Sequence, residues 1–146
     1  MSNDRSLSLD VTHHVRDHCL CLHVQRAARA LARRFDEALR PVKLTNGQFS
    51  LLISLSRPSP PSIGSVADLL AMDRTTLTAA LKPLVRRGLV KIAPGKKDKR
   101  SRLLSLTPAG RKLLARAVPL WKREHAAVNR KITDAARLRA DLRALN

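Results

Sequence analysis

The sequence predicts a mainly α-helical protein with one small β-hairpin. Apolar residues recur at spacings of three and four over 11–39 and again from residue 113 onwards, which is the period of an amphipathic helix. Two short apolar runs, 89–93 and 102–106, flank a basic segment that contains Pro and Gly, a pattern typical of a hairpin. A chain of 146 residues, 44% of them hydrophobic, can bury the core of one domain of ordinary size, so we expect a single domain over 1–146.

The N-terminal third predicts an arm and two helices. Residues 1–10 are polar and show no period, so we expect a loose arm. The 29 residues of 11–39 contain neither Gly nor Pro and predict one long helix, which Pro41 ends. A second helix is expected after Thr45, where polar capping residues precede an apolar run. It ends before the Pro- and Ser-rich connector 57–61.

The next two helices are predicted to be short and joined by a tight turn. Ser62 can cap the first helix and Asp73 the second, by accepting hydrogen bonds from the first free backbone amides. The second helix runs to about Arg87, where Gly88 ends it. Pro83 removes one backbone hydrogen bond, so we expect it to bend this helix without disturbing the first two turns.

The second of these helices has two chemically different faces. The residues of one face are apolar, and we expect them in the core: Leu77, Leu81, Leu84 and Val85. The residues of the opposite face are small or basic: Thr75, Thr78, Ala79, Lys82 and Arg86. Helix, tight turn, helix and basic hairpin is the order of a winged helix-turn-helix, in which the second helix enters the major groove of DNA. Thr can contact base edges, and Lys and Arg can contact phosphates, so we expect 45–110 to bind DNA.

The C-terminal part of the sequence predicts a further long helix, and the helices at both ends of the chain together predict a homodimer. Thr107 and Pro108 begin that helix, Pro119 is expected to kink it, and a short helix follows Thr133. The helical segments at the two ends of the chain, about 11–40 and 112–146, are amphipathic and too long for one small winged helix to cover. An uncovered apolar stripe favours a homodimer, so we interpret these segments as dimerisation helices.

The charge balance indicates the class of partner. Lys and Arg number 29 against 11 Asp and Glu, a formal net charge of +18, and such an excess favours a polyanion. Only Phe35, Phe49 and Trp121 are aromatic, whereas single-strand and RNA-binding modules stack bases on aromatic side chains, so duplex DNA is preferred. No apolar stretch is long enough for a membrane span and no secretory signal is visible, so we expect a cytoplasmic protein without a membrane partner.

Several motifs closely resemble the MarR family of transcriptional regulators, from about residue 12 to the C-terminus. The matching segments are 73–78 (Asp-Arg-Thr-Thr-Leu-Thr), 84–90 and 98–110, and the most specific motif is the wing pattern D-x-R-x-x-x-L-x-L-T-x-x-G that begins at Asp98. The resemblance implies a homodimer with interlocking N- and C-terminal helices, whose two winged helices bind an inverted-repeat operator. It also implies that Arg100 enters the minor groove and that Asp98 orients it. The candidate DNA-binding residues are Arg74, Thr75, Thr76, Thr78, Lys82, Arg86, Lys96, Lys97, Asp98, Lys99, Arg100 and Arg102.

These observations predict a sequence-specific transcriptional regulator, a repressor that a small molecule or an oxidising signal releases from its operator. The alternative is a nonspecific architectural DNA-binding protein, which would need the cations but has no use for a Thr-rich face. We do not expect an enzyme, because the glycines are scattered and form no phosphate-binding loop, and no nucleophile motif is present.

The densest group of reactive side chains lies in the first predicted helix. Cys19 falls on the apolar stripe, whereas Cys21 is turned by about 200° from it. Three interpretations are open: cysteines that pack as small apolar residues, a thiol that senses oxidants, and metal binding by the pairs His14 and His18 or Cys19 and His23. Two ligands do not complete a metal site, so we expect no metal and no cofactor. The candidate sensor or ligand-pocket residues are Cys19, His23 and Trp121.

Overall fold

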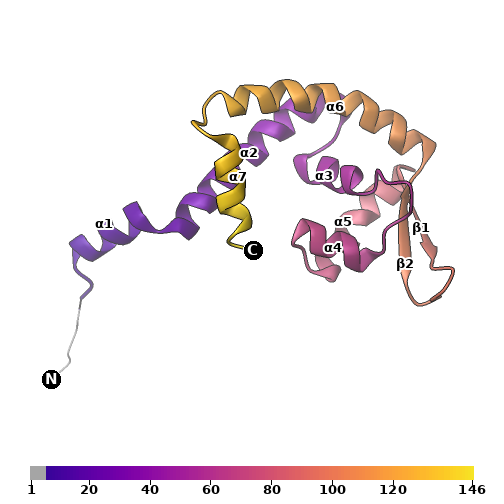
Figure 1. The fold of residues 1–146 in the computed structure, drawn as a ribbon, viewed down its shortest axis with the longest axis horizontal. Helices are drawn as coiled ribbons and strands as arrows, with labels where there is room; N and C mark the ends of the chain where they lie inside the picture. The colour runs from indigo at the N-terminus through magenta and orange to yellow at the C-terminus, as the bar shows by residue number, and fades with distance from the viewer. Residues whose placement is uncertain (1–5) are drawn as a thin grey trace. The chain divides into compact units, whose positions relative to one another are not determined.

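The structure is a computed structural model that describes residues 6–146. It consists of helices and one two-stranded antiparallel sheet (Figure 1), so the predicted fold class is confirmed. The described chain separates into two compact units, one that ends at Arg34 and one that comprises residues 35–146. The boundary between them falls inside the second helix, α2 (Leu20–Leu39). No helix among the described residues is long and apolar enough to cross a membrane.

The first unit contains α1 (Leu9–His18) and most of α2, so the prediction of one long helix over 11–39 is wrong. The helix breaks at Cys19, whose backbone is extended at φ −70° and ψ 109°. The Leu22 backbone N–H donates to Cys19 Sγ over 3.5 Å, which gives α2 a start of its own. Residues 1–5 of the predicted arm lie outside the described residues, and residues 6–8 are exposed and belong to no helix or strand. The arm prediction is wrong at Leu9 and Asp10, which belong to α1.

Three helices of the second unit form the helix-turn-helix part: α3 (Asn46–Ser54), α4 (Ile63–Leu70) and α5 (Arg74–Arg86). Thr45 begins α3 with a capping box, because its side chain accepts from the Gln48 amide while the Gln48 side chain accepts from the Thr45 amide. Ala71 ends α4 in the left-handed region at φ 51°, which turns the chain sharply into α5. The residues of the shared core that are most fully buried are leucines and a valine: Leu39, Leu52, Leu77, Leu81, Leu84, Leu104 and Val66.

The hairpin pairs β1 (Val90–Pro94) with β2 (Arg102–Leu106), in a register that sets Val90 opposite Leu106. The first strand thus lies one residue later than predicted. The connector that precedes α4 also binds the hairpin, because the Leu104 N–H donates to the Pro61 carbonyl over 2.8 Å. This contact ties the base of the wing, the β1–β2 hairpin, to the start of α4.

Two helices complete the chain, α6 (Pro108–Asn129) and α7 (Ala135–Arg143). Figure 1 shows α6 beside α3, with α4 and α5 on the other side of α3. A Cβ at Gly110 would lie 2.2 Å from the Leu89 carbonyl oxygen, so only Gly permits the first turn of α6 to pack against the end of the helix-turn-helix. α6 continues through Pro119 to its C-terminus.

Candidate nucleic-acid interface

The first turn of α5 is built around Asp73, as predicted. The Thr76 N–H donates to Asp73 Oδ1 over 2.8 Å, and the Thr76 hydroxyl donates to Asp73 Oδ2 over 2.7 Å. The backbone bond and the hydroxyl bond lower the pKa of the Asp73 carboxyl, because both stabilise its charged form. The Thr76 hydroxyl proton is therefore used in the helix cap. At 100° per residue, Thr76 is also turned by about 100° from Thr75 around the helix axis.

The face predicted to contact DNA is exposed along α5. Thr75, Thr78, Ala79 and Lys82 line an open hollow on this face together with Arg74. The Thr78 hydroxyl donates to the Arg74 carbonyl over 2.7 Å, so its oxygen remains able to accept a hydrogen bond.

The apolar face agrees with the prediction at three positions and differs at one. Leu77, Leu81 and Leu84 are buried, whereas Val85 is 40% exposed. Val85 lies about 100° further around the helix than Leu84, beyond the strip that α4 and the hairpin cover.

A second hollow joins α5 to the wing. Arg74 and Thr78 line it on the α5 side, and Arg100 and Arg102 on the wing side, around a volume of about 370 Å³. Arg74 and Thr78 also line the hollow along α5, so the two hollows form one continuous concave surface from Lys82 to the wing. The surface is lined mainly by cations and hydroxyl groups, which suits a polyanion with hydrogen-bonding edges.

Ser62, Gly64 and Ser101 also line this surface, and the sequence reasoning missed them as site residues. A Cβ at Gly64 would lie 2.7 Å from the Arg74 guanidinium, so this glycine gives the Arg74 side chain room to extend over the start of α4. The sequence carried one signal for this role: Gly64 lies in the first turn of α4, and Arg74 is the first residue of the next helix, α5.

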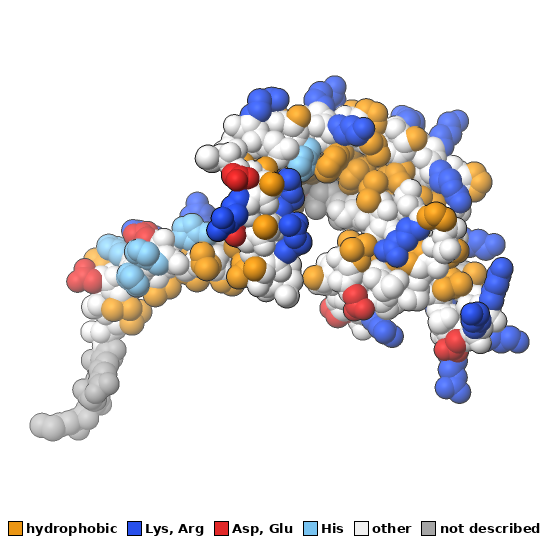
Figure 2. Space-filling model, in the orientation of Figure 1, with side chains coloured by type: hydrophobic (Ala, Val, Ile, Leu, Met, Phe, Trp, Pro, Cys, Tyr) orange, Lys and Arg blue, Asp and Glu red, His pale blue; other side chains and the backbone are white. Residues whose placement is uncertain are grey.

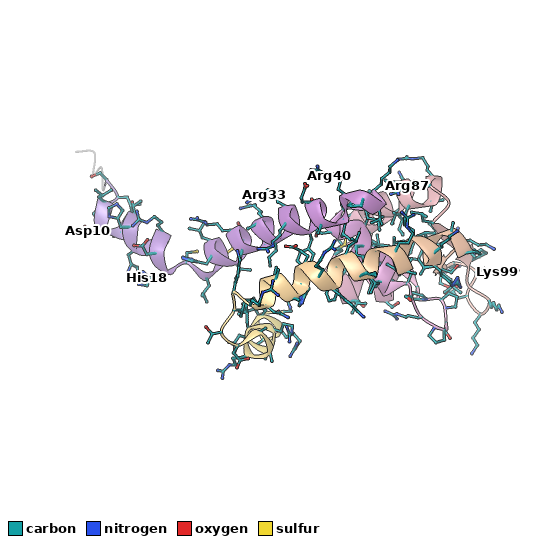
Figure 3. The ribbon with its side chains drawn as sticks, turned by 90° about the horizontal axis from the view of Figure 1, so that it is seen from above. Asp10, His18, Arg33, Arg40, Arg87 and Lys99 are labelled. Atoms are coloured by element: carbon teal, nitrogen blue, oxygen red, sulfur yellow. The ribbon has the colours of Figure 1, made fainter. Side chains whose placement is uncertain are left out.

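The wing tip is shaped by Asp98. Its carboxylate accepts from the Arg100 backbone N–H over 2.9 Å, and its carbonyl accepts from the Ser101 hydroxyl over 2.8 Å. The resemblance to the MarR family implied that Asp98 orients Arg100. In the structure, Asp98 holds Arg100 through the Arg100 backbone N–H. Lys96, Lys97 and Lys99 are exposed around this turn. Figure 2 shows the cations gathered at the hairpin, and Figure 3 shows Lys99 at that end of the unit.

The candidate sensor residues Cys19 and His23 lie in the first unit. Cys19 is half-buried and Cys21 is exposed, in agreement with their predicted difference. The His23 ring Nδ1 lies 2.8 Å from the Cys19 carbonyl oxygen, and the rings of His14 and His18 stack at 4.3 Å. His18 lies at the end of α1 that Figure 3 labels. Within residues 6–146, no three side chains of the metal-ligating types gather at one place.

Trp121, the third candidate sensor residue, lies in the second unit. Its ring stacks on Phe49 at 6.0 Å and on His125 at 4.5 Å, and His125 also contacts the Phe35 ring. The three aromatic residues of the chain therefore meet in one place. A small cavity of about 110 Å³ opens beside them, with Leu39, Asn46 and Ser50 in its wall. Trp121 is thus a pocket-wall residue, one of the roles expected for it.

Comparison with known proteins places this geometry in a family. The model of the MarR family matches residues 44–101, the segment from the start of α3 to the wing tip. The structure of the M. tuberculosis transcriptional regulator MosR in complex with DNA is 40% identical in sequence, with a TM-score of 0.81. The match covers 88% of this chain and 93% of that one.

Two further relatives have names that report opposite effects on transcription. The transcriptional repressor CouR, bound to a 23-mer DNA duplex, is 30% identical with a TM-score of 0.75, and the match covers 90% of this chain and 92% of that one. The transcriptional activatory protein BadR of Rhodopseudomonas palustris is 33% identical over 95 residues, which is 63% of this chain and 54% of BadR. The chain therefore spans about half the length of that relative.

Proposed function

Because the chain belongs to the MarR family of transcriptional regulators, a family of DNA-binding proteins and not of enzymes, we propose that it binds an inverted-repeat operator as a homodimer and represses transcription from it in the cytoplasm. The observation that carries this proposal is the continuous concave surface from Lys82 to the wing. There Thr75 and Thr78 are available to base edges, while Arg100 and Arg102 are available to the backbone or the minor groove.

The homodimer is supported by apolar side chains that the chain leaves exposed at both ends. α7 exposes Leu138 at 41% and Leu142 at 39%, and Leu145 follows at 64%. In the first unit, Leu9 is 68% exposed and Val15 54% exposed. Exposed apolar stripes of this kind on helices favour association with a second copy, and a two-fold dimer presents two identical α5 helices to two half-sites.

We propose repression and not activation, because of the way in which two winged helices would occupy a promoter. A protein that occupies a promoter through two winged helices excludes other proteins from it. The 40% identical MosR and the repressor CouR both have structures with DNA, whereas BadR, whose name reports activation, is matched over only about half its length.

Two places in the chain can receive a releasing signal. The aromatic cavity beside Trp121 and Phe49 has the apolar walls that a small aromatic molecule prefers, with Asn46 and Ser50 as polar groups that can orient it. Cys19 is the half-buried thiol at the α1–α2 break, where oxidation would add polar atoms to a helix start. We propose release by a small molecule at the first place or by an oxidant at the second.

Nuclease footprinting on the DNA upstream of the chain's own gene, combined with transcription in vitro, tests the proposal. The expected result is a protected inverted repeat and a fall in transcript as the protein is added. Uniform protection without a repeat would instead favour the architectural alternative. An Arg100→Ala variant should lose protection, whereas Lys43→Ala, an equal change of charge outside the concave surface and the dimerisation helices, should keep it.

A further inference from the structure

A second basic surface lies on α6, on the side that faces away from the helix-turn-helix. Lys112, Arg116 and Arg123 lie within about 40° of one another around the helix axis at 100° per residue. Arg130, the residue that caps the C-terminus of α6, falls in the same strip. All four side chains are exposed, and we call them the α6 stripe.

The stripe is directly opposite the buried face of the same helix. Gly110, Leu114, Ala117 and Val128 are the buried residues of α6, and they are turned by about 140° to 200° from Lys112. That buried face packs on α3, on the short 3-10 helix η1 (Arg40–Val42) and on β2. Because the cations point the other way, they cannot contact DNA that lies on α5 and the wing. Figure 2 shows Lys and Arg side chains along the edge that α6 forms.

The positive charge of residues 108–146 lies outside the concave surface that is proposed to bind the operator. Residues 108–146 contain ten Lys and Arg and three Asp and Glu, a net of +7. Among the described residues, no ion pair joins an acidic side chain to Lys112, Arg116 or Arg123. A solvated helix face usually alternates charges of opposite sign at spacings of three and four, whereas Lys112 and Arg116 are a like-charged pair at a spacing of four, which opposes helix stability. A row of cations kept in this arrangement favours an extended polyanion that neutralises it.

The length of the stripe indicates which polyanion fits. From Lys112 to Arg130 the helix axis rises by about 27 Å. Duplex DNA carries one phosphate charge per about 1.7 Å of its axis, so a segment of this length presents phosphates along the whole row. Pro119 and Ala126 lie in the same strip between the cations, and their small side chains would let a phosphate backbone approach the helix closely.

We propose that the α6 stripe binds a second DNA duplex, so that one molecule holds two duplexes on opposite sides of its second unit. This inference goes beyond the proposed function and rests on it only for the first duplex. A regulator with this property joins separate segments of DNA in addition to occupying an operator. Binding at the stripe is independent of sequence, because its four cations lie in one row along the outside of a helix and meet phosphates, and phosphate contacts carry no sequence information.

The test is a two-duplex retention experiment with the full chain. An unlabelled duplex is immobilised, the protein is bound and washed, and a fluorescent second duplex is added at 50 mM salt. The unmodified protein should retain the fluorescent duplex. The variant Arg116→Glu, Arg123→Glu should bind the first duplex with unchanged affinity but retain at least tenfold less of the second. The variant Lys43→Glu, Arg57→Glu makes the same change of net charge at two exposed positions that lie outside the α5–wing surface and outside the dimerisation helices, and it should behave as the unmodified protein.

Each remaining outcome decides against the inference or against its premise. Retention of the protein without the second duplex would refute the α6 stripe as a DNA site. A change of molecular mass in the Arg116→Glu, Arg123→Glu variant would make the stripe a contact between protomers and refute the inference too. Uptake of polyglutamate in place of duplex, lost in that variant, would assign the stripe to an acidic protein. Failure of the unmodified protein to stay on the first duplex would instead refute the proposed function.

Discussion

Lys82 provides the most quantitative test of how α5 meets DNA. It is exposed on the face that carries Thr75, Thr78 and Ala79 and lines the same hollow. If it contacts one phosphate per protomer, Lys82→Ala removes two contacts from a dimer. Each contact contributes about 0.9 to the slope of log K against log salt, so the magnitude of the slope should fall by about 1.8. At 0.15 M salt, that loss corresponds to an affinity about 30-fold weaker.

The assay is fluorescence anisotropy on an operator duplex and on an unrelated duplex, at salt concentrations from 0.05 M to 0.3 M. Lys82→Ala should weaken binding to both duplexes by similar factors, because a phosphate contact carries no sequence information. Lys131→Ala, which removes the same charge after the end of α6, is the matched control and should leave the slope unchanged. An unchanged slope for Lys82→Ala, or a loss confined to the operator, would refute the phosphate contact.

Three further predictions concern stability and signalling. Leu81 is 1% exposed in the core between α5 and its neighbours, so Leu81→Ala should lower the free energy of unfolding by about 2 to 5 kcal/mol in urea titration, and a loss below about 1 kcal/mol would contradict the packing. The pKa of Asp73 is lowered in the folded chain, so its cap stabilises α5 above the ordinary Asp range and should be lost as pH falls through the lowered pKa. Asp73→Asn should therefore show a shallower fall of melting temperature with acid, and an identical pH profile would count against the cap. If Cys19 senses oxidants, peroxide should release DNA from the unmodified protein and from Cys21→Ser but not from Cys19→Ser; equal responses of both variants would exclude the thiol switch.

The sequence alone predicted the parts of the fold that follow from strong local chemistry. The Asp73 cap, the Ser62 cap and the second strand all lie where capping residues and apolar runs indicated. The break at Cys19 could not be predicted in the same way, because neither Gly nor Pro marks it and the capping atom is a sulfur. A thiol acceptor is too weak and too rare at helix starts for its position to be read from spacing.

The face of α5 that forms the candidate site could be predicted from the sequence, but the roles of individual residues could not. Sorting α5 by its helical period found Thr75 and Lys82, since both depend only on spacing. Thr76 could not be distinguished from them, because its role depends on the bond that its hydroxyl makes with Asp73. The role of Gly64 depends on a neighbouring side chain from another helix. The α6 stripe was missed although its signal was present, as cations at spacings of four and seven on one face of a single helix.

Selection of binding sites from a random duplex library tests the central claim most directly, because it asks whether the Thr-bearing face of α5 reads sequence. The unmodified protein should return an inverted repeat whose half-sites lie about 10 bp apart. Thr75→Ala should return a repeat with an altered preference at one base pair of each half-site, worth about 1 to 3 kcal/mol, while Lys82→Ala returns the original repeat with lower yield. Recovery of unrelated sequences by the unmodified protein, or the same repeat from Thr75→Ala, would contradict the account.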